Sequence, residues 1–260
     1  MMLQARIERY LRRGFQPAVS EILVLMEESA SALFSAFPDR FILFGGAALV
    51  LFHGSPRLSR DLDLLAKAEE LPAPEAVQNV VEARTQPLAE ILGLGKLDFS
   101  WAGTNQGFIK IWVQSNQRRL FSIDLTRIGG TVLQGQLLEQ PIAWDVSKTV
   151  TTPSASYLLF QKCETFLDRR YVKARDAFDI DLLLSKGASL DDNLVAHLDD
   201  FIQMRELDGE SIRSRIASVD RKRSTVELRA VLPSESFTEL AKQDFQPLRR
   251  SLEIVFREWI

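Results

Sequence analysis

Hydrophobic and polar positions follow different periods in different parts of this chain. Residues 1–37 carry apolar side chains at spacings of three and four, which predicts helix. Short apolar runs and alternating runs then predict strands over much of residues 38–150. After Pro153 the helical spacing returns and continues to the end, and we place the C-terminal domain at residues 151–260. We therefore expect an N-terminal helical segment, an α/β core and a mostly helical C-terminal domain, which is an α+β class overall.

Five runs inside the core predict its strands. Polar and apolar residues alternate in the later ones, as expected of half-exposed strands. The five runs are residues 39–46, 60–67, 96–103, 107–114 and 119–128. Residues 47–54 predict a short helix, and residues 73–92 predict a longer one that Pro87 should break or kink. We expect the stretch from Gly129 to Thr152 to be irregular.

Composition narrows the classes of function. The chain has 260 residues, 46% of them hydrophobic and 26% charged, with a net charge of −3. This excludes binding of polyanions by bulk charge, so contact with nucleic acid would need a local basic patch. The only cysteine, Cys163, is expected to be buried in an apolar run. With no apolar stretch near the roughly 18 residues of a membrane span, we expect a cytoplasmic protein without a membrane partner.

Two carboxylates in the second predicted strand need an explanation. Asp61 and Asp63 share one strand face, while Leu62 projects to the other. Their repulsion must be relieved by a proton or a cation. Oxygen ligands of this kind suit Mg²⁺, and Asp124 in another predicted strand is a candidate third ligand. Three carboxylates on neighbouring strands can hold two metal ions for phosphoryl chemistry, although a structural ion-pair network is the alternative.

Two glycines precede this acidic strand. Gly45 and Gly46 end the first strand and open a short helix, so their backbone N–H groups can face phosphate oxygens. A pair of glycines alone indicates only a turn. The order of strand, glycine pair, helix, acidic strand and later aspartate is more specific.

Two segments resemble a known family. "FGGAALVLFHGSPRLSRDLDLLAK" resembles the core motif of the DNA polymerase β-like nucleotidyltransferases, and within them the AbiEii/AbiGii-type toxins. "KCETFLDRRYVKARDAFDIDLL" is similar to the downstream signature of the same toxins. The residues that fall on this second signature are Lys162, Arg169, Arg175, Asp176 and Asp179. Ala47 departs from the pattern, because relatives often have Ser or Thr there.

The resemblance implies a fold and a reaction. The fold is a polymerase β-like core, a mixed sheet with flanking helices, followed by a helical domain. The enzyme would transfer NMP from an NTP to an acceptor, with RNA and the 3′ end of tRNA favoured. Its biological role would be that of a toxin in a toxin–antitoxin or phage-defence system, with a separately encoded antitoxin.

The resemblance also implies roles for individual residues. Two Mg²⁺ ions would be held by Asp61, Asp63 and Asp124. Lys162 and Asp176 would also be catalytic residues, together with these three aspartates. The expected nucleotide-binding residues are Gly45, Gly46, Arg57, Ser59, Lys162 and Arg175.

Several alternatives stay open. The same fold could serve a non-catalytic nucleotide-binding or interaction protein, or a nucleotidyltransferase that modifies a protein or a small molecule. Arg57 could offset the charge of the aspartates, and Asp176 could form a structural salt bridge with Arg169 or Lys173. The basic clusters at residues 168–175 and 213–223 fit either a phosphate backbone or solvated helix faces.

Overall fold

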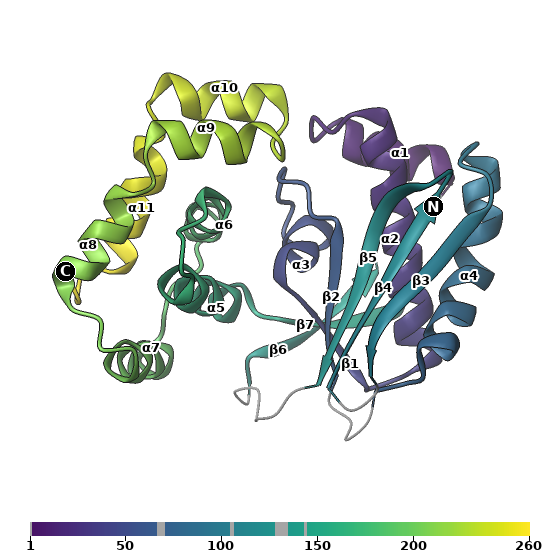
Figure 1. Ribbon diagram of the computed structural model, residues 1–260, viewed down its shortest axis with the longest axis horizontal. Helices are drawn as coiled ribbons and strands as arrows, with labels where there is room; N and C mark the ends of the chain where they lie inside the picture. The colour runs from purple at the N-terminus through teal and green to yellow at the C-terminus, as the bar shows by residue number, and fades with distance from the viewer. Residues whose placement is uncertain (1, 67–70, 105–106, 128–134, 143–144) are drawn as a thin grey trace. The chain divides into compact units, whose positions relative to one another are not determined.

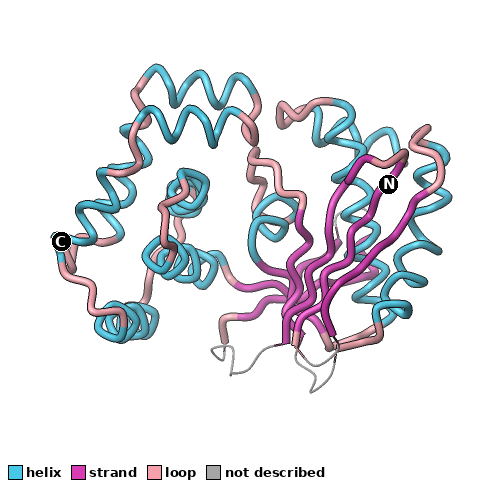
Figure 2. The backbone as a smooth tube through the Cα atoms, viewed as in Figure 1, coloured by secondary structure: helices cyan, strands magenta, loops and turns pink. Residues whose placement is uncertain are grey.

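A computed structural model of the chain describes residues 2–66, 71–104, 107–127, 135–142 and 145–260. The chain divides into two compact units, which Figures 1 and 2 show in ribbon and tube form. The sheet unit comprises Met1–Gly54 and Leu58–Pro153. The helical unit comprises Ser55–Arg57 and Ser154–Ile260. Three residues that precede the acidic strand therefore belong to the helical unit.

Five strands form the central sheet of the sheet unit, in the order β1-β2-β5-β4-β3. Their bounds are Phe41–Phe44 (β1), Asp61–Ala66 (β2), Leu97–Thr104 (β3), Phe108–Ser115 (β4) and Arg118–Arg127 (β5). β2 runs parallel to β5, and the other neighbouring pairs are antiparallel. The five predicted strands are confirmed, and so is the predicted mixed sheet with flanking helices.

The two faces of the sheet differ in polarity. In β4 the side chains of Ile109, Ile111 and Val113 are fully buried, and the residues between them are partly exposed. The buried face packs against α2 (Pro17–Ala36) and α4 (Pro74–Ile91), which lie together on one side of the sheet (Figure 1). Burial of each such aliphatic side chain contributes roughly 1.5–3 kcal/mol. The opposite face of β4 carries Lys110 and Gln114 together with the aromatic Phe108 and Trp112.

The N-terminal helices are joined by a buried ion cluster. α1 (Leu3–Leu11) packs on α2 through Glu27, which is fully buried. Arg6 and Arg9 form ion pairs with this carboxylate, and the Tyr10 hydroxyl donates a hydrogen bond to it. Burial raises the pKa of Tyr10 to about 12, so the phenol stays protonated as a donor.

Two features of the sheet unit differ from the prediction. α4 continues through Pro87 to Ile91, so the proline does not break the helix, and a kink there stays a prediction. The stretch expected to be irregular contains a hairpin of β6 (Leu137–Ile142) and β7 (Asp145–Pro153). Alternation is interrupted in this hairpin by Pro141, where the pairing register also shifts. Gly129 itself lies outside the described residues.

The described helical unit consists of seven helices. They are α5 (Ala155–Asp168), α6 (Ala174–Ser185), α7 (Asp192–Met204), α8 (Gly209–Ala217), α9 (Arg221–Arg229), α10 (Ser234–Lys242) and α11 (Gln246–Val255). Breaks between these helices lie near residues 186–187, 208–209 and 233. At the start of α8 the Asp208 carboxylate accepts a hydrogen bond from the Ser211 N–H, which satisfies a free donor of the first turn. No helix in the described part of the chain has the length and apolar content that a bilayer crossing requires.

Candidate active site

Strand register brings the three predicted aspartates to one face of the sheet. Asp63 in β2 lies opposite Asp124 in β5, and Asp61 lies opposite Ser122. Asp124 in turn lies opposite Lys110 in β4. Side chains opposite one another on neighbouring strands project to the same face. The polar face of the sheet therefore carries three carboxylates and one lysine within three adjacent strands.

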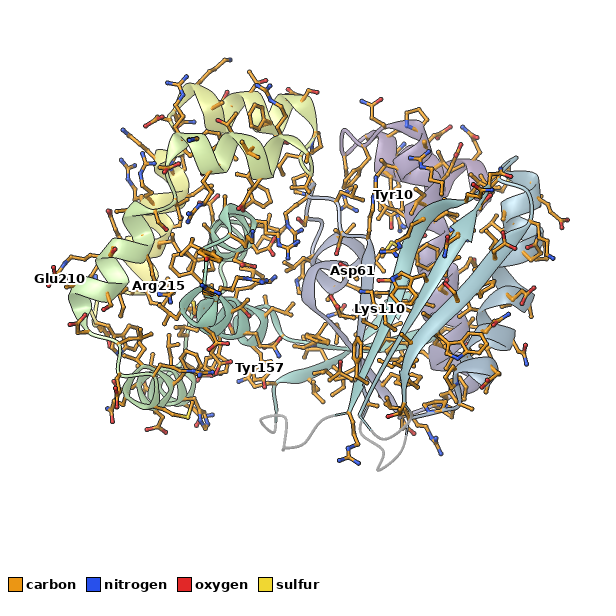
Figure 3. The ribbon with its side chains drawn as sticks, viewed as in Figure 1. Tyr10, Asp61, Lys110, Tyr157, Glu210 and Arg215 are labelled. Carbon is orange, nitrogen blue, oxygen red and sulfur yellow. The ribbon has the colours of Figure 1, made fainter. Side chains whose placement is uncertain are left out.

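Two of these carboxylates share a hydroxyl and a cation. The Ser122 hydroxyl lies 2.7 Å from Asp61 Oδ1 and 2.9 Å from Asp124 Oδ1. Lys110 Nζ lies 2.7 Å from Asp124 Oδ2 and 3.7 Å from Asp61 Oδ1, and Figure 3 shows it beside Asp61. The Asp61 side chain is 53% exposed and that of Asp124 is 18% exposed. The ammonium thus relieves the repulsion that two adjacent carboxylates would otherwise cause.

The third carboxylate lies against the glycine turn. Gly45 begins α3 (Gly45–Leu51) with a φ of +67°, a conformation that favours glycine. A Cβ at this position would lie 2.5 Å from Asp63 Oδ2. Any side chain here would displace the carboxylate, so Gly45 is required by both its backbone angle and its neighbour. Gly46 follows inside the helix and is buried.

The donor atoms are of the kind that Mg²⁺ prefers, although they do not form a complete metal site. Among the described residues, no group of three or more Asp, Glu, His or Cys side chains is arranged to hold a metal ion. Asp61 and Asp124 nevertheless offer hard oxygen donors beside Ser122, and they already bind one cation, the ammonium of Lys110. These residues fit a divalent cation by their chemistry.

Arg57 forms a buried ion pair within the helical unit. It belongs to the helical unit, where its Nε and Nη2 donate to the two oxygens of Asp179 over 2.7 and 2.9 Å. The Arg57 side chain is 5% exposed and that of Asp179 is 0% exposed. The guanidinium therefore neutralises the buried charge of Asp179. Ser59, two residues later, is buried immediately before β2.

Lys162 and Asp176 lie in the same cluster of the helical unit, which we call the α5–α6 cluster (Arg57, Lys162, Arg169, Asp176 and Asp179). Lys162 Nζ lies 2.7 Å from Asp179 Oδ2 and 3.8 Å from Asp176 Oδ1. Arg169 Nε donates to Asp176 Oδ2 over 2.6 Å. Within the described structure, the buried Oδ1 of Asp176 accepts no hydrogen bond.

Charge keeps Asp179 ionised despite its burial. Burial by itself raises the pKa of a carboxyl group, but the charges of Lys162 and Arg57 and their hydrogen bonds outweigh this effect. The pKa of Asp179 is consequently below its ordinary value. Asp179 thereby fixes the position of Lys162. Arg175, expected at the nucleotide, is exposed, whereas Asp176 and Asp179 on the same helix are buried.

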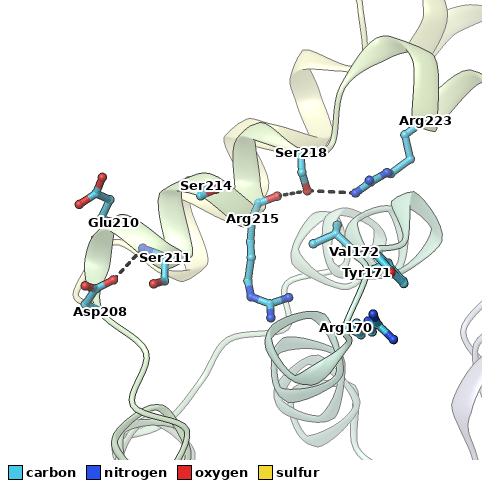
Figure 4. Close-up of a pocket in the computed structure, with 10 residues that line it drawn as sticks. All are labelled: Arg170, Tyr171, Val172, Asp208, Glu210, Ser211, Ser214, Arg215, Ser218 and Arg223. Atoms are coloured by element: carbon cyan, nitrogen blue, oxygen red, sulfur yellow. Dashed lines mark hydrogen bonds between the residues drawn. The ribbon is translucent and has the colours of Figure 1, made fainter.

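The helical unit also has an open groove of about 590 Å³, shown in Figure 4. Two segments that the sequence marked as basic line it, one in the α5–α6 loop and one in α8 and α9. The ten lining residues are Arg170, Tyr171, Val172, Asp208, Glu210, Ser211, Ser214, Arg215, Ser218 and Arg223. We call this feature the arginine groove.

Three side chains give the arginine groove its chemistry. Tyr171 is 61% exposed, and the guanidinium of Arg170 lies 5.2 Å from the centre of its ring. Arg223 is held by a hydrogen bond from its Nη1 to the Ser218 hydroxyl (Figure 4). Asp208 and Glu210 add negative charge among the lining residues. The groove offers cations together with an exposed aromatic ring.

Sequence reasoning missed Lys110 and Ser122. Alternation in the run 107–114 places Lys110 on the polar face of its strand, so its orientation could be predicted. Its partner Asp124 could not be predicted, because the register of β4 against β5 depends on the turn between them and on a bulge at Val113–Gln114. Ser122 stands two residues before Asp124, and the same alternation places both side chains on one face.

Comparison with known proteins identifies the family. The profile described as the nucleotidyl transferase AbiEii toxin of a type IV toxin–antitoxin system matches residues 29–258. The chain belongs to this AbiEii family. It is a nucleotidyltransferase toxin by family, as the two sequence segments indicated. No curated protein matches the sequence.

Solved structures share the fold of this AbiEii family member. A candidate nucleotidyltransferase from Helicobacter pylori is 14% identical, with a TM-score of 0.54 over 100% of this chain and 97% of its own. JHP933 from Helicobacter pylori is 13% identical, with a TM-score of 0.54 over 91% and 90% of the two chains. MenT4, a nucleotidyltransferase toxin from Mycobacterium tuberculosis, is 15% identical, with a TM-score of 0.50 over 97% and 94%. At these identities the likeness shows the fold alone.

Proposed function

We propose that this AbiEii family member is a Mg²⁺-dependent enzyme that transfers NMP from an NTP to a hydroxyl group of RNA. The 3′ end of tRNA is the proposed acceptor, a separately encoded antitoxin the proposed partner, and the cytoplasm the proposed location. The observation that carries the proposal is the acidic face of the sheet, where Asp61, Asp63 and Asp124 lie on adjacent strands beside the glycine turn.

In the proposed reaction, an oxygen of the acceptor hydroxyl attacks the α-phosphorus of the NTP. The bond from that phosphorus to the oxygen bridging to the β-phosphate breaks, and pyrophosphate leaves. Asp61, Asp63 and Asp124 are the proposed Mg²⁺ ligands. The bound ions would supply positive charge to neutralise the phosphate oxygens as the bond breaks.

Other parts of the chain would bind and orient the nucleotide. The N–H groups at Gly45 and Gly46 are proposed to donate to phosphate oxygens, since no side chain is present to block their approach. Lys162, whose ammonium is already fixed by Asp179, is the proposed triphosphate contact of the helical unit. Arg57, Ser59 and Arg175 are the further proposed nucleotide contacts.

The arginine groove supports RNA as the acceptor. A single strand is bound by cations along its backbone and by aromatic rings on which bases stack. Arg170, Tyr171 and Arg223 supply both kinds of group in one groove. This combination of cations and an aromatic ring favours RNA over a protein or a small molecule as the acceptor.

The test is incorporation of label from each α-³²P-labelled NTP with Mg²⁺, using tRNA, total RNA and total protein as separate acceptors. We expect label on tRNA with the wild type and loss of at least about a thousandfold in Asp61→Ala/Asp63→Ala, because charge neutralisation dominates phosphoryl transfer. Asp98→Ala is the matched control, since Asp98 is an exposed carboxylate of β3 in the same sheet. It should retain wild-type activity.

The outcomes separate the alternatives. Label on protein alone would reject RNA as the acceptor but keep the reaction. Binding of NTP without transfer to any acceptor would favour a non-catalytic nucleotide-binding protein. Equal activity in the wild type and the double variant would reject the acidic face as the site.

A further inference from the structure

We propose that Lys110 is an internal counter-ion that competes with the divalent cation for Asp61 and Asp124. This inference rests on the proposed function, because it assumes that these carboxylates are metal ligands. It adds a residue that neither family motif contains, and it gives that residue a role before the nucleotide binds.

The position of the ammonium carries the proposal. Lys110 Nζ lies 2.7 Å from Asp124 and 3.7 Å from Asp61, on the oxygens that a metal ion would use. The Ser122 hydroxyl also lies between the two carboxylates, near the same Oδ1 of Asp61 and near the other oxygen, Oδ1, of Asp124, so the pair is held together while the ammonium is bound. A cation with one charge therefore occupies a place suited to a cation with two.

The environment makes this ammonium exchangeable. The Lys110 side chain is 24% exposed, and Asp61 is 53% exposed. By contrast, Lys162 is 13% exposed and pairs with a carboxylate that is fully buried. A lysine has a flexible four-carbon chain, so its ammonium can leave the carboxylates while its backbone stays fixed in β4.

Displacement has a consequence for nucleotide binding. An ammonium that has lost its carboxylate partners beside a divalent cation is repelled by it. A triphosphate supplies new negative charge for that ammonium. Metal binding should therefore be weak in the nucleotide-free protein and stronger when nucleotide is present, and the two ligands should increase the affinity for each other equally.

Mn²⁺ binding to the nucleotide-free protein tests the proposal. Free Mn²⁺ is measured by its electron paramagnetic resonance signal as protein is added, for the wild type, Lys110→Met and Lys110→Arg. We expect Lys110→Met to bind Mn²⁺ at least about tenfold more tightly, because one positive charge within 4 Å of the ligands has been removed. Lys110→Arg keeps the charge and should stay within about threefold of the wild type.

Two controls separate this effect from a change of net charge or a loss of structure. Lys96→Met removes the same charge from an exposed position next to β3 and should leave Mn²⁺ affinity unchanged. Melting temperatures are measured in EDTA and in Mn²⁺. Lys110→Met should be less stable than the wild type in EDTA, where the carboxylates repel each other, and should gain more stability than the wild type from Mn²⁺. If Lys110→Met does not fold, Lys110→Gln replaces it in the same titration.

Failure of the inference differs from failure of the proposed function. Equal Mn²⁺ affinity in the wild type and Lys110→Met would overturn the counter-ion role and leave the metal site intact. Absence of Mn²⁺ binding in every variant, with and without an NTP, would overturn both. Tighter binding in both Lys110→Met and Lys110→Arg would also overturn it, because loss of the side chain and not of its charge would then be responsible.

Discussion

Replacement of Asp179 by Asn isolates the electrostatic contribution of the α5–α6 cluster. Asp179 is fully buried and accepts hydrogen bonds from Arg57 and Lys162 through both carboxylate oxygens. Asn has nearly the same volume, so the substitution leaves no cavity. It removes the negative charge beside two cations whose side chains are 5% and 13% exposed.

The contacts of the Asp179 carboxylate determine how much unfolding free energy the substitution should remove. Three short interactions, at 2.7, 2.9 and 2.7 Å, converge on one carboxylate. Charge-assisted hydrogen bonds contribute roughly 1.5–3 kcal/mol each, but they share one acceptor group and do not add. Removal of one partner from a buried ion pair typically costs about 3–5 kcal/mol, which is the loss of unfolding free energy that we expect.

Urea unfolding at pH 7, followed by circular dichroism at 222 nm, measures this loss. Asp200→Asn is the control, because it removes the same charge from an exposed position of α7, and it should change the free energy by less than about 0.5 kcal/mol. Arg57→Met/Asp179→Asn should cost less than the sum of the single changes, since the first leaves the buried carboxylate without its Arg57 partner and the second removes that carboxylate's charge. A loss below about 1 kcal/mol in Asp179→Asn would refute the reasoning.

The dependence of unfolding free energy on pH gives a second test of the same prediction. The pKa of Asp179 is lowered in the folded protein, so its ionised form stabilises the fold above the unfolded pKa of about 3.9. This contribution is lost as pH falls through the lower, folded pKa. The stability difference between the wild type and Asp179→Asn should therefore be largest near neutral pH and shrink in acid. A difference independent of pH would point to packing and not to charge.

Three further substitutions have defined outcomes. Burial and the neighbouring carboxylate of Asp168 raise the pKa of Glu164 to about 7. The wild type therefore loses stability as the pH rises from about 4.5 to 7, because the folded protein disfavours the ionised form of Glu164. Glu164→Gln should raise the melting temperature more at pH 8 than at pH 5. Gly45→Ala places a residue with a side chain at a φ of +67° and a Cβ against Asp63, so it should lower the free energy of unfolding by roughly 1–3 kcal/mol. Gly93→Ala is the control and should cost less, because Gly93 has a similar φ of +70° but a Cβ there would have no neighbour within 4 Å. Arg223→Glu reverses a charge in the arginine groove and should weaken binding of single-stranded RNA about tenfold in a filter assay, with thermal stability unchanged. Equal RNA binding by the wild type and this variant would show that the groove does not bind RNA.

Much of the fold was predictable because each strand of the central sheet carries its own pattern. The alternation in β4 and β5 fixes which side chains face the core, and it places Asp124 on the polar face. The same pattern in β2 places Asp61 and Asp63 together. The hairpin of β6 and β7 has no such regular alternation, and its pairing with a register shift at Pro141 depends on contacts distant in sequence.

Partners across long sequence distances were not predictable. Arg57 and Asp179 are 122 positions apart, and nothing local indicates that residues 55–57 leave the sheet unit to join the helical one. The sequence left open whether Arg57 contacts phosphate or offsets the charge of the aspartates that follow it. Lys110 is the residue that does so for Asp61 and Asp124, through strand pairing that a sequence pattern does not encode.

Exposure distinguishes the two carboxylate clusters and decides what each can do. Asp179 and Asp61 both lie beside an internal cation, but the Asp179 side chain is 0% exposed and that of Asp61 is 53% exposed. A hydrated divalent ion cannot reach a fully buried carboxylate without opening the helical unit, and two basic groups already satisfy that charge. The ammonium of Lys110 lies 3.7 Å from Asp61 and closer to Asp124, and the exposed side chain of Asp61 is accessible to water. Ion exchange is therefore expected on the sheet, whereas the buried cluster holds Lys162 in one position.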